Sequence, residues 1–200
     1  QAPDFIITKN LNTTFNWDTY HSALPDDKYL IFTNAEARNQ GFSGRSTSTV
    51  FKTEHDYSTN ENEDYIAYCW HNVPGLQKFG SYTNFSSSDG AFVELGFKPA
   101  ILMYKCSINI SSSSGSGDWM IIDTTRSLVN NPSDMNNLSL NVNNAEDSYY
   151  SASQGAVDIL SNGFKIRHPN SSPGGDPGRL YIYAAWAEAP NINLYGAQAN

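Results

Sequence analysis

A thiol, an indole and an imidazole stand side by side at Cys69, Trp70 and His71, within the run DYIAYCWHNVP of residues 64–74. A cysteine thiolate beside an imidazole can act as a nucleophile, so this triplet is a candidate reactive centre. The same run is rich in aromatic residues, which is typical of a packed β-strand. A second occurrence of the pattern elsewhere in the chain separates these two interpretations.

Carboxylates are the next side chains that could do chemistry. A pair of them standing roughly 5 to 10 Å apart across a cleft hydrolyses glycosidic bonds. Their spacing along this chain selects no pair, which favours solvated positions. The available residues are Asp56, Glu61, Glu63, Asp64, Asp118, Asp123, Glu146, Asp147 and Asp158.

The four histidines, at positions 21, 55, 71 and 168, lack the spacing with cysteines or carboxylates that a zinc site requires. The loops NNAED (143–147) and PGGDPG (173–178) carry oxygen ligands that suit calcium, although such sequences serve turns more often. We therefore predict no metal site and no cofactor, and calcium binding by these loops stays open.

Twelve Lys and Arg residues against twenty Asp and Glu residues leave a net charge of -8, without a basic block. An acidic surface repels nucleic-acid phosphates and anionic lipids, so neither nucleic acid nor membrane is an expected partner. The two cysteines, Cys69 and Cys106, each lie in an apolar run. We predict that both are free and buried, since unpaired cysteine often behaves as a small core residue.

Short β-strands are expected to position these side chains. Runs rich in β-branched and aromatic residues recur between turn residues and predict an all-β, antiparallel fold. A helical turn is expected only near 147–154. The predicted strands are residues 5–8, 29–32, 49–52, 65–71, 79–82, 91–97, 100–106, 119–123, 138–142, 157–160, 163–167 and 180–188.

The strand that holds the triplet has a second version near the C-terminus. YIAYCWHN (65–72) aligns with YIYAAWAE (181–188), and NAE recurs at 34–36 and 144–146. In the second version Cys69 and His71 are replaced by alanines. Alternate strand residues share a face, so the retained residues indicate a packing surface rather than a reactive centre. The predicted core residues are Ile66, Trp70, Trp119, Ile182 and Trp186.

The string from YIAYCWHNVPG to LMYKC, followed by GDWMIIDTTR, NNAED, VDILSNGFKIR and LYIYAAWAEAP, carries a family resemblance. It resembles a β-sandwich module of tail fibres and other virion structural proteins of tailed, marine-type bacteriophages. The resemblance implies a jelly roll of the concanavalin A or laminin-G kind, present in tandem. On this pattern residues 1–74 form a first repeat and residues 75–200 form a complete second repeat.

The first repeat lacks the opening strands of the second, because residues 2–5 align with residues 98–101. The resulting edge invites pairing with another strand. Either the N-terminal copy is truncated, or a neighbouring subunit or an upstream segment supplies the missing edge.

Such a module implies a non-enzymatic attachment function on the surface of a virion, where it contacts a host or virion partner. The resemblance also implies a homo-oligomer, with a trimer as one form, and a host-surface glycan as a ligand. Two alternatives stay open: a tailspike-type hydrolase that degrades polysaccharide, and a purely architectural capsid-decoration or filament subunit.

A glycan site needs an aromatic platform with short polar side chains for the sugar hydroxyls. Residues in or near predicted loops supply both, although aromatics at strand ends also cap a core and Asn or Asp also serves turns. The candidate ligand-binding residues are Tyr82, Asn84, Phe85, Asp89, Asn143, Asn144, Tyr149 and Tyr150.

Overall fold

The computed structural model describes residues 1–25, 28–32, 37–38, 46–51, 62–85, 89–107, 117–126, 130, 136, 138–143, 145–146, 157–167 and 178–188. These residues form three antiparallel β-sheets and contain no helix. The predicted all-β, antiparallel β-sandwich fold is therefore confirmed. The helical turn predicted at 147–154 lies outside the described residues.

Sheet A comes from the N-terminal third of the chain, and its strands run in the order β4-β3-β2-β1-β5. Strand β1 lies between β2 and β5 and pairs antiparallel with both. Strand β5 follows a long connection and takes the edge position. The strands are β1 (Phe5–Asn10), β2 (Asp18–His21), β3 (Tyr29–Ile31), β4 (Ala37–Arg38) and β5 (Tyr65–Trp70).

Sheets B and C come from the rest of the chain. Sheet B has the order β10-β9-β8-β13-β6, and sheet C has the order β11-β12-β7. Sheet B contains β6 (Gln77–Thr83), β8 (Pro99–Cys106), β9 (Met120–Asp123), β10 (Leu138–Ser139) and β13 (Leu180–Ala187). Sheet C contains β7 (Phe92–Glu94), β11 (Val157–Leu160) and β12 (Gly163–Ile166).

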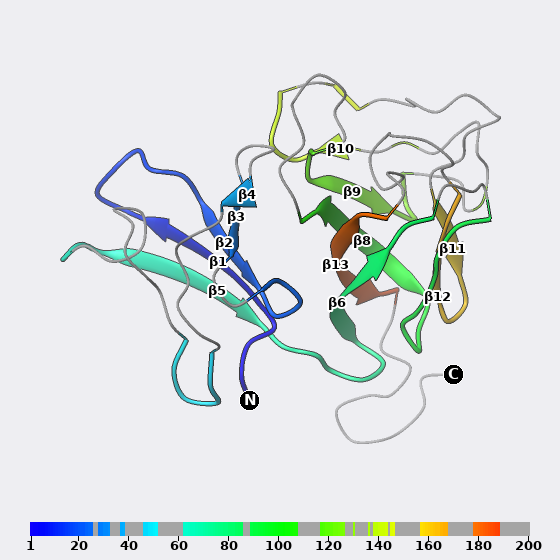
Figure 1. Ribbon diagram of the computed structural model, residues 1–200, viewed down its shortest axis with the longest axis horizontal. Helices are drawn as coiled ribbons and strands as arrows, with labels where there is room; N and C mark the ends of the chain where they lie inside the picture. The colour runs from blue at the N-terminus through cyan, green and yellow to red at the C-terminus, as the bar shows by residue number, and fades with distance from the viewer. Residues whose placement is uncertain are drawn as a thin grey trace.

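Sheet B is the middle layer, with sheet A on one side and sheet C on the other (Figure 1). The sequence of strand β13 is apolar at nearly every position because both of its faces are buried. Tyr181 and Tyr183 pack in the core shared with sheet C, whereas Ile182 and Ala184 pack in the core shared with sheet A. Because successive side chains point to opposite faces, a strand in the middle layer needs apolar residues on both.

Sheets A and B share one pairing order. In sheet A, β1 lies between β2 and β5; in sheet B, β8 lies between β9 and β13. The tryptophans follow this order. Trp70 and Trp186, which occupy the same place in the two aligned segments, lie on β5 and β13, and a tryptophan directly precedes both β2 (Trp17) and β9 (Trp119). Sheet B continues past β13 to β6, whereas no described strand continues sheet A past β5.

The predicted boundary between residues 74 and 75 falls in the turn that joins β5 to β6. Backbone hydrogen bonds close this turn, from Val73 N to Gln77 O at 3.0 Å and from Leu76 N to Val73 O at 3.0 Å. Phe5 and Leu30, from before the turn, share a hydrophobic cluster with Phe79, from after it. The two segments are thus held together by a common core.

Three details differ from the sequence predictions. Residues 49–51 form no strand. Strand β2, with the sequence DTYH, was not predicted because it has no apolar alternation; it is nevertheless fully buried between β1 and β3. Cys69 is exposed rather than buried because β5 is an edge strand, whereas Cys106 is buried; the prediction that both thiols are free is confirmed.

Candidate functional site

Four aromatic rings form a continuous row along the boundary between sheets A and B, which we call the aromatic row: Trp17, Tyr68, Trp70 and Trp186. Trp17 and Tyr68 stack with ring centroids 6.4 Å apart and an interplanar angle of 19°. Tyr68 and Trp70 stack at 6.2 Å and 22°. Trp70 then meets Trp186 edge to face, at 6.4 Å and 77°.

Local structure explains the row. Tyr68 and Trp70 are two residues apart on β5, so their side chains leave the same face of sheet A. Their partners on β1, Ile7 and Phe5, belong to the core cluster between sheets A and B. The row is therefore the rim of that core, at the point where the edge strand leaves it uncovered.

The rings of the row are both anchored and accessible. Trp17, Trp70 and Trp186 are half-buried and pack against the core, whereas 44% of the Tyr68 surface is exposed. A fixed ring with an open face loses little conformational freedom when an apolar surface stacks on it. Such a platform suits the apolar face of a sugar ring, and the net charge of -8 disfavours nucleic-acid bases as alternative stacking partners.

Polar groups gather near the backbone of Trp70, to whose carbonyl Asp4 N donates at 2.7 Å. The carboxylate of Asp4 accepts hydrogen bonds from Ser22 Oγ at 3.0 Å and from the Asn72 backbone N–H at 2.8 Å. Asn72 Oδ1 accepts the backbone N–H of Phe79 at 2.7 Å. A carboxylate offers about four lone-pair positions, so Asp4 keeps acceptor capacity beyond these two bonds.

The structure separates the predicted ligand-binding residues. Tyr82 is buried and stacks on Tyr181 with ring centroids 5.3 Å apart, and Asn84 is also buried. Phe85 is 62% exposed, and Asn143 is exposed. The rings of Tyr82 and Phe85, close in sequence, thus have opposite environments. Asn144, Tyr149 and Tyr150 lie outside the described residues.

Asp89, another predicted ligand-binding residue, belongs to a surface ion-pair network on sheet C. It forms ion pairs with Lys165 Nζ and, at 3.3 Å, with Arg167 Nη1. Hydrogen bonding from Lys165 lowers the pKa of the Asp89 carboxyl. Arg167 also contacts Asp158 at 2.6 Å. Because Asp89 already pairs with two cationic side chains of the protein, its carboxylate is poorly suited to bind a separate ligand.

The predicted core residues differ in burial. Trp119 and Ile182 are fully buried, and Trp70 and Trp186 are half-buried against the core. Trp119 Nε1 donates to the Ile31 carbonyl at 2.9 Å, which ties sheet B to sheet A. Ile66 is half-buried and does not belong to the described core clusters.

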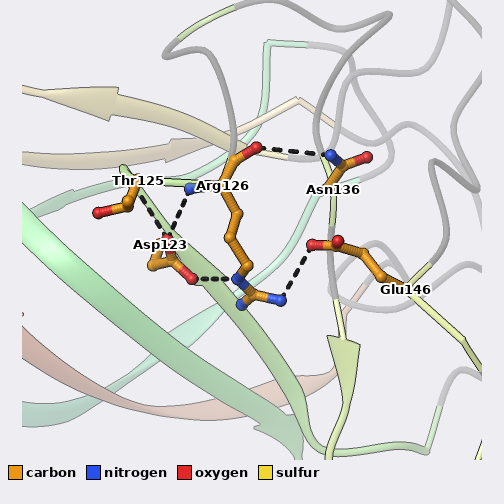
Figure 2. Close-up of polar contacts among 5 residues, drawn as sticks. All are labelled: Asp123, Thr125, Arg126, Asn136 and Glu146. Atoms are coloured by element: carbon orange, nitrogen blue, oxygen red, sulfur yellow. Dashed lines mark hydrogen bonds and ion pairs between the residues drawn. The ribbon is translucent and has the colours of Figure 1, made fainter.

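A second polar cluster lies at the end of β9 (Figure 2). Arg126 lies between two carboxylates, with its Nε bonded to Asp123 and its Nη1 3.0 Å from Glu146 Oε1. Asp123 Oδ1 also accepts the backbone N–H groups of Thr125 at 3.0 Å and Arg126 at 2.8 Å, and Asn136 Nδ2 donates to the Arg126 carbonyl at 3.4 Å. This arrangement caps a turn.

The electrostatics of this cluster do not favour acid catalysis. Burial by itself raises the pKa of the Asp123 carboxyl, but hydrogen bonds and charge from Arg126 outweigh it and hold the pKa below its ordinary value. A general acid at neutral pH needs a raised pKa instead. Asp118, another of the predicted carboxylates, accepts a hydrogen bond from Asn141 Nδ2 at 2.7 Å.

The Cys69–Trp70–His71 triplet does not form an activated nucleophile. Cys69 and Trp70 point to opposite faces of β5, and partial burial raises the pKa of the Cys69 thiol. A reactive cysteine has a lowered pKa. His21, by contrast, is fully buried: its Nε2 lies 3.0 Å from the Tyr183 carbonyl, and its Nδ1 accepts the Ala23 N–H at 3.1 Å.

Within the described part of the chain, no three His, Cys, Asp or Glu side chains group closely enough to hold a metal ion. None of the described segments forms a helix long and apolar enough to cross a bilayer.

Comparison with known protein families gives a match over nearly the whole chain. The model described as a domain of unknown function, DUF7483, matches residues 1–190. The chain belongs to the DUF7483 family. The match spans all three described sheets. No curated protein and no solved structure matches the chain.

Alternation along the predicted strand at 65–71 places Tyr68 and Trp70 on one face, but the sequence did not predict a site there. The available signal was two aromatics in alternation on one strand. It became informative only with the position of β5 at a sheet edge, which leaves that face partly open.

Proposed function

We propose that this DUF7483 chain is a non-enzymatic attachment module that binds carbohydrate on a cell or virion surface through the aromatic row. The observation that carries the proposal is the parallel stacking of Trp17, Tyr68 and Trp70 at a partly open sheet rim. Stacked rings offer an elongated apolar platform, which suits successive sugar units of a chain. Asp4, beside Trp70, supplies acceptors for hydroxyl groups.

The setting we propose is a bacteriophage virion appendage of the tail-fibre kind, with the module on the particle surface and as part of a homo-oligomer. This part rests on the resemblance of the sequence motifs. The tandem jelly-roll organisation is part of the same proposal. It is supported by the shared pairing order of β2-β1-β5 and β9-β8-β13.

Attachment is preferred to hydrolysis because of the partners of the carboxylates. Asp123 and Glu146 share Arg126, and Asp158 is paired with Arg167. A glycosidase needs one carboxyl that stays protonated near neutral pH, whereas cationic partners favour the ionised form. A tailspike-type hydrolase stays the alternative for carboxylates that lie outside the described residues.

The test is binding of the purified chain to an array of bacterial surface polysaccharides and to whole bacterial cells. Tyr68→Ala removes the most exposed ring of the row and is expected to weaken binding at least tenfold. Phe92→Ala is the matched control: its ring, on β7 of sheet C, is also exposed, but it lies outside the row. Equal binding by wild type and Tyr68→Ala, or a loss confined to Phe92→Ala, contradicts the proposed site.

A product assay on the bound polysaccharide separates attachment from hydrolysis. Binding without release of shorter oligosaccharides supports the proposal, whereas release supports the hydrolase. An architectural subunit is the second candidate, favoured by the open edge of β5, and it predicts a defined oligomer that binds no glycan.

A further inference from the structure

The outer edge of β5 presents backbone groups that no described strand pairs. Leu11 N donates to Asp64 O at 2.8 Å, so Leu11 and Asp64 form a hydrogen-bonded pair at the start of the β1–β5 ladder. Hydrogen-bonded pairs recur at every second residue of an antiparallel ladder, so the backbone groups of Ile66, Tyr68 and Trp70 face β1. Those of Ala67 and Cys69 therefore point away from sheet A, and both residues are exposed.

This edge lacks the usual protection of free strands. Natural edges carry lysine, proline or a bulge that blocks pairing with another chain. Strand β5, with the sequence YIAYCW, has no charge or proline and pairs with β1 in an unbroken register. The other long edge strand, β6, includes Lys78, which donates to the Glu94 carbonyl at 2.7 Å.

Sheet B shows what occupies the equivalent edge. There β13, the sequence counterpart of β5, pairs antiparallel with β6 along seven residues. The equivalent position beside β5 thus has the geometry to accept an antiparallel strand of similar length.

We propose that the occupant is β5 of a second copy of this chain, paired antiparallel across a two-fold axis so that sheet A continues from one copy into the other. The side chains at the two ends of β5 suit a second copy in antiparallel rather than parallel orientation. Glu63 and Asp64 are exposed just before β5, and His71 is exposed just after it. Antiparallel pairing places each acidic end near the His71 end of the other copy, whereas parallel pairing would place acid beside acid.

The outward direction of the Ala67 and Cys69 backbone groups also determines the register between the two copies of β5. Ala67 of each copy exchanges hydrogen bonds with Cys69 of the other, so Tyr68 of one copy lies directly opposite Tyr68 of the other. Residues in such a pair approach to about 4.5 Å between Cα atoms, which lets the two rings pack. The two-fold axis therefore passes beside Tyr68, the most exposed ring of the aromatic row.

The first test is the mass of the full chain in solution, measured by analytical ultracentrifugation over a range of concentrations. We expect a reversible dimer for the wild type. Ala67→Pro removes an outward N–H and is expected to raise the dimer dissociation constant at least tenfold. Ser81→Pro is the matched control, since Ser81 is exposed and faces outward from the other long edge, β6. Circular dichroism checks that both variants fold.

A wild type that stays monomeric, or that has a trimeric mass, overturns the proposal, as does an equal effect of the two proline variants. A second test does not depend on proline. Hydrogen-bonded antiparallel partners lie about 5.5 Å apart between Cα atoms, within the range of a disulfide. Ala67→Cys, oxidised with copper phenanthroline, is expected to cross-link to native Cys69 of the second copy.

The double variant Ala67→Cys with Cys69→Ser removes that partner. Loss of the covalent dimer in the double variant supports both the contact and its register. Absence of any covalent dimer in Ala67→Cys overturns the proposal. Neither result depends on glycan binding, so failure of the dimer and failure of the proposed attachment function are distinguishable.

Discussion

Trp70 and Trp186, the matching tryptophans of the two aligned strands, contact each other edge to face with ring centroids 6.4 Å apart. Each also contacts the shared core, since Trp70 lies 5.4 Å from Phe5 and Trp186 lies 5.7 Å from Phe79. The strands that look alike in sequence therefore meet at the boundary of sheets A and B. This contact places the aromatic row where the two sheets join.

Docking of sheet A on sheet B is expected to depend on Trp119. Trp119→Phe removes the hydrogen bond to the Ile31 carbonyl and leaves unfilled volume in a buried site. We expect a loss of about 2 to 4 kcal/mol in the free energy of unfolding, measured by chemical denaturation. Trp17→Phe is the control, because Trp17 precedes β2 as Trp119 precedes β9 but is only half-buried, and it should cost less than about 1 kcal/mol.

Stability is expected to fall in mild acid because of His21. Burial lowers its pKa from 6.5 to about 4, against opposing effects of the Tyr183 carbonyl and Asp4. Between these values the unfolded chain binds a proton that the folded chain does not, so the stabilisation is present above pH 6.5 and is lost as the pH falls towards 4. The full loss is about 3 kcal/mol.

Denaturation curves at several pH values check this expectation. His21→Gln keeps a donor for the Tyr183 carbonyl but does not titrate, so its stability should vary less between pH 6.5 and 4. Parallel pH profiles for the two proteins would contradict the assignment.

Gly163 is expected to tolerate no side chain. A Cβ atom at this position would lie 2.0 Å from the Val93 carbonyl oxygen of the neighbouring strand. Gly163→Ala must therefore disrupt the β12–β7 pairing, and we expect a loss of about 2 to 4 kcal/mol in thermal or chemical unfolding. Gly75→Ala is the control, with a φ of +75° but open space, and should cost roughly 1 to 2 kcal/mol from backbone strain alone.

Arg126 is expected to control the ionisation of Asp123. Arg126→Gln removes the cation that outweighs burial, so the pKa of the Asp123 carboxyl should rise. Carboxyl carbon chemical shifts, followed by NMR against pH, measure this directly. Lys98→Gln, which breaks a separate exposed pair with Glu188, should leave the Asp123 titration unchanged.

The strands that sequence reasoning predicted well are those whose own residues carry the signal. Strand β13 is apolar on both faces, and β11 and β12 flank a short turn at Asn162, so each is recognisable without its neighbours. Strand β2 lacks that signal because its polar residues are buried by tertiary contacts, as when His21 bonds to the Tyr183 carbonyl. The predicted strand at 49–52 has β-branched and aromatic character, but residues 49–51 gain no pairing partner.

The predicted ligand-binding residues show the same limit. Tyr82 and Phe85 were grouped because they are close in sequence, yet alternation along β6 directs Tyr82 into the core while Phe85, beyond the strand end, is exposed. Tyr68 and Trp70 became a candidate site only because β5 takes the edge of sheet A.

The sequence by itself determined the all-β class, most strand positions, and the correspondence between the strands of Trp70 and Trp186, because these depend on side-chain alternation and turn residues along the chain. Only the tertiary structure decided that sheet B is the middle layer, that His21 is buried, and that β5 is an open edge. Those features depend on which surfaces pack together, and packing joins residues far apart in the chain that no local pattern connects.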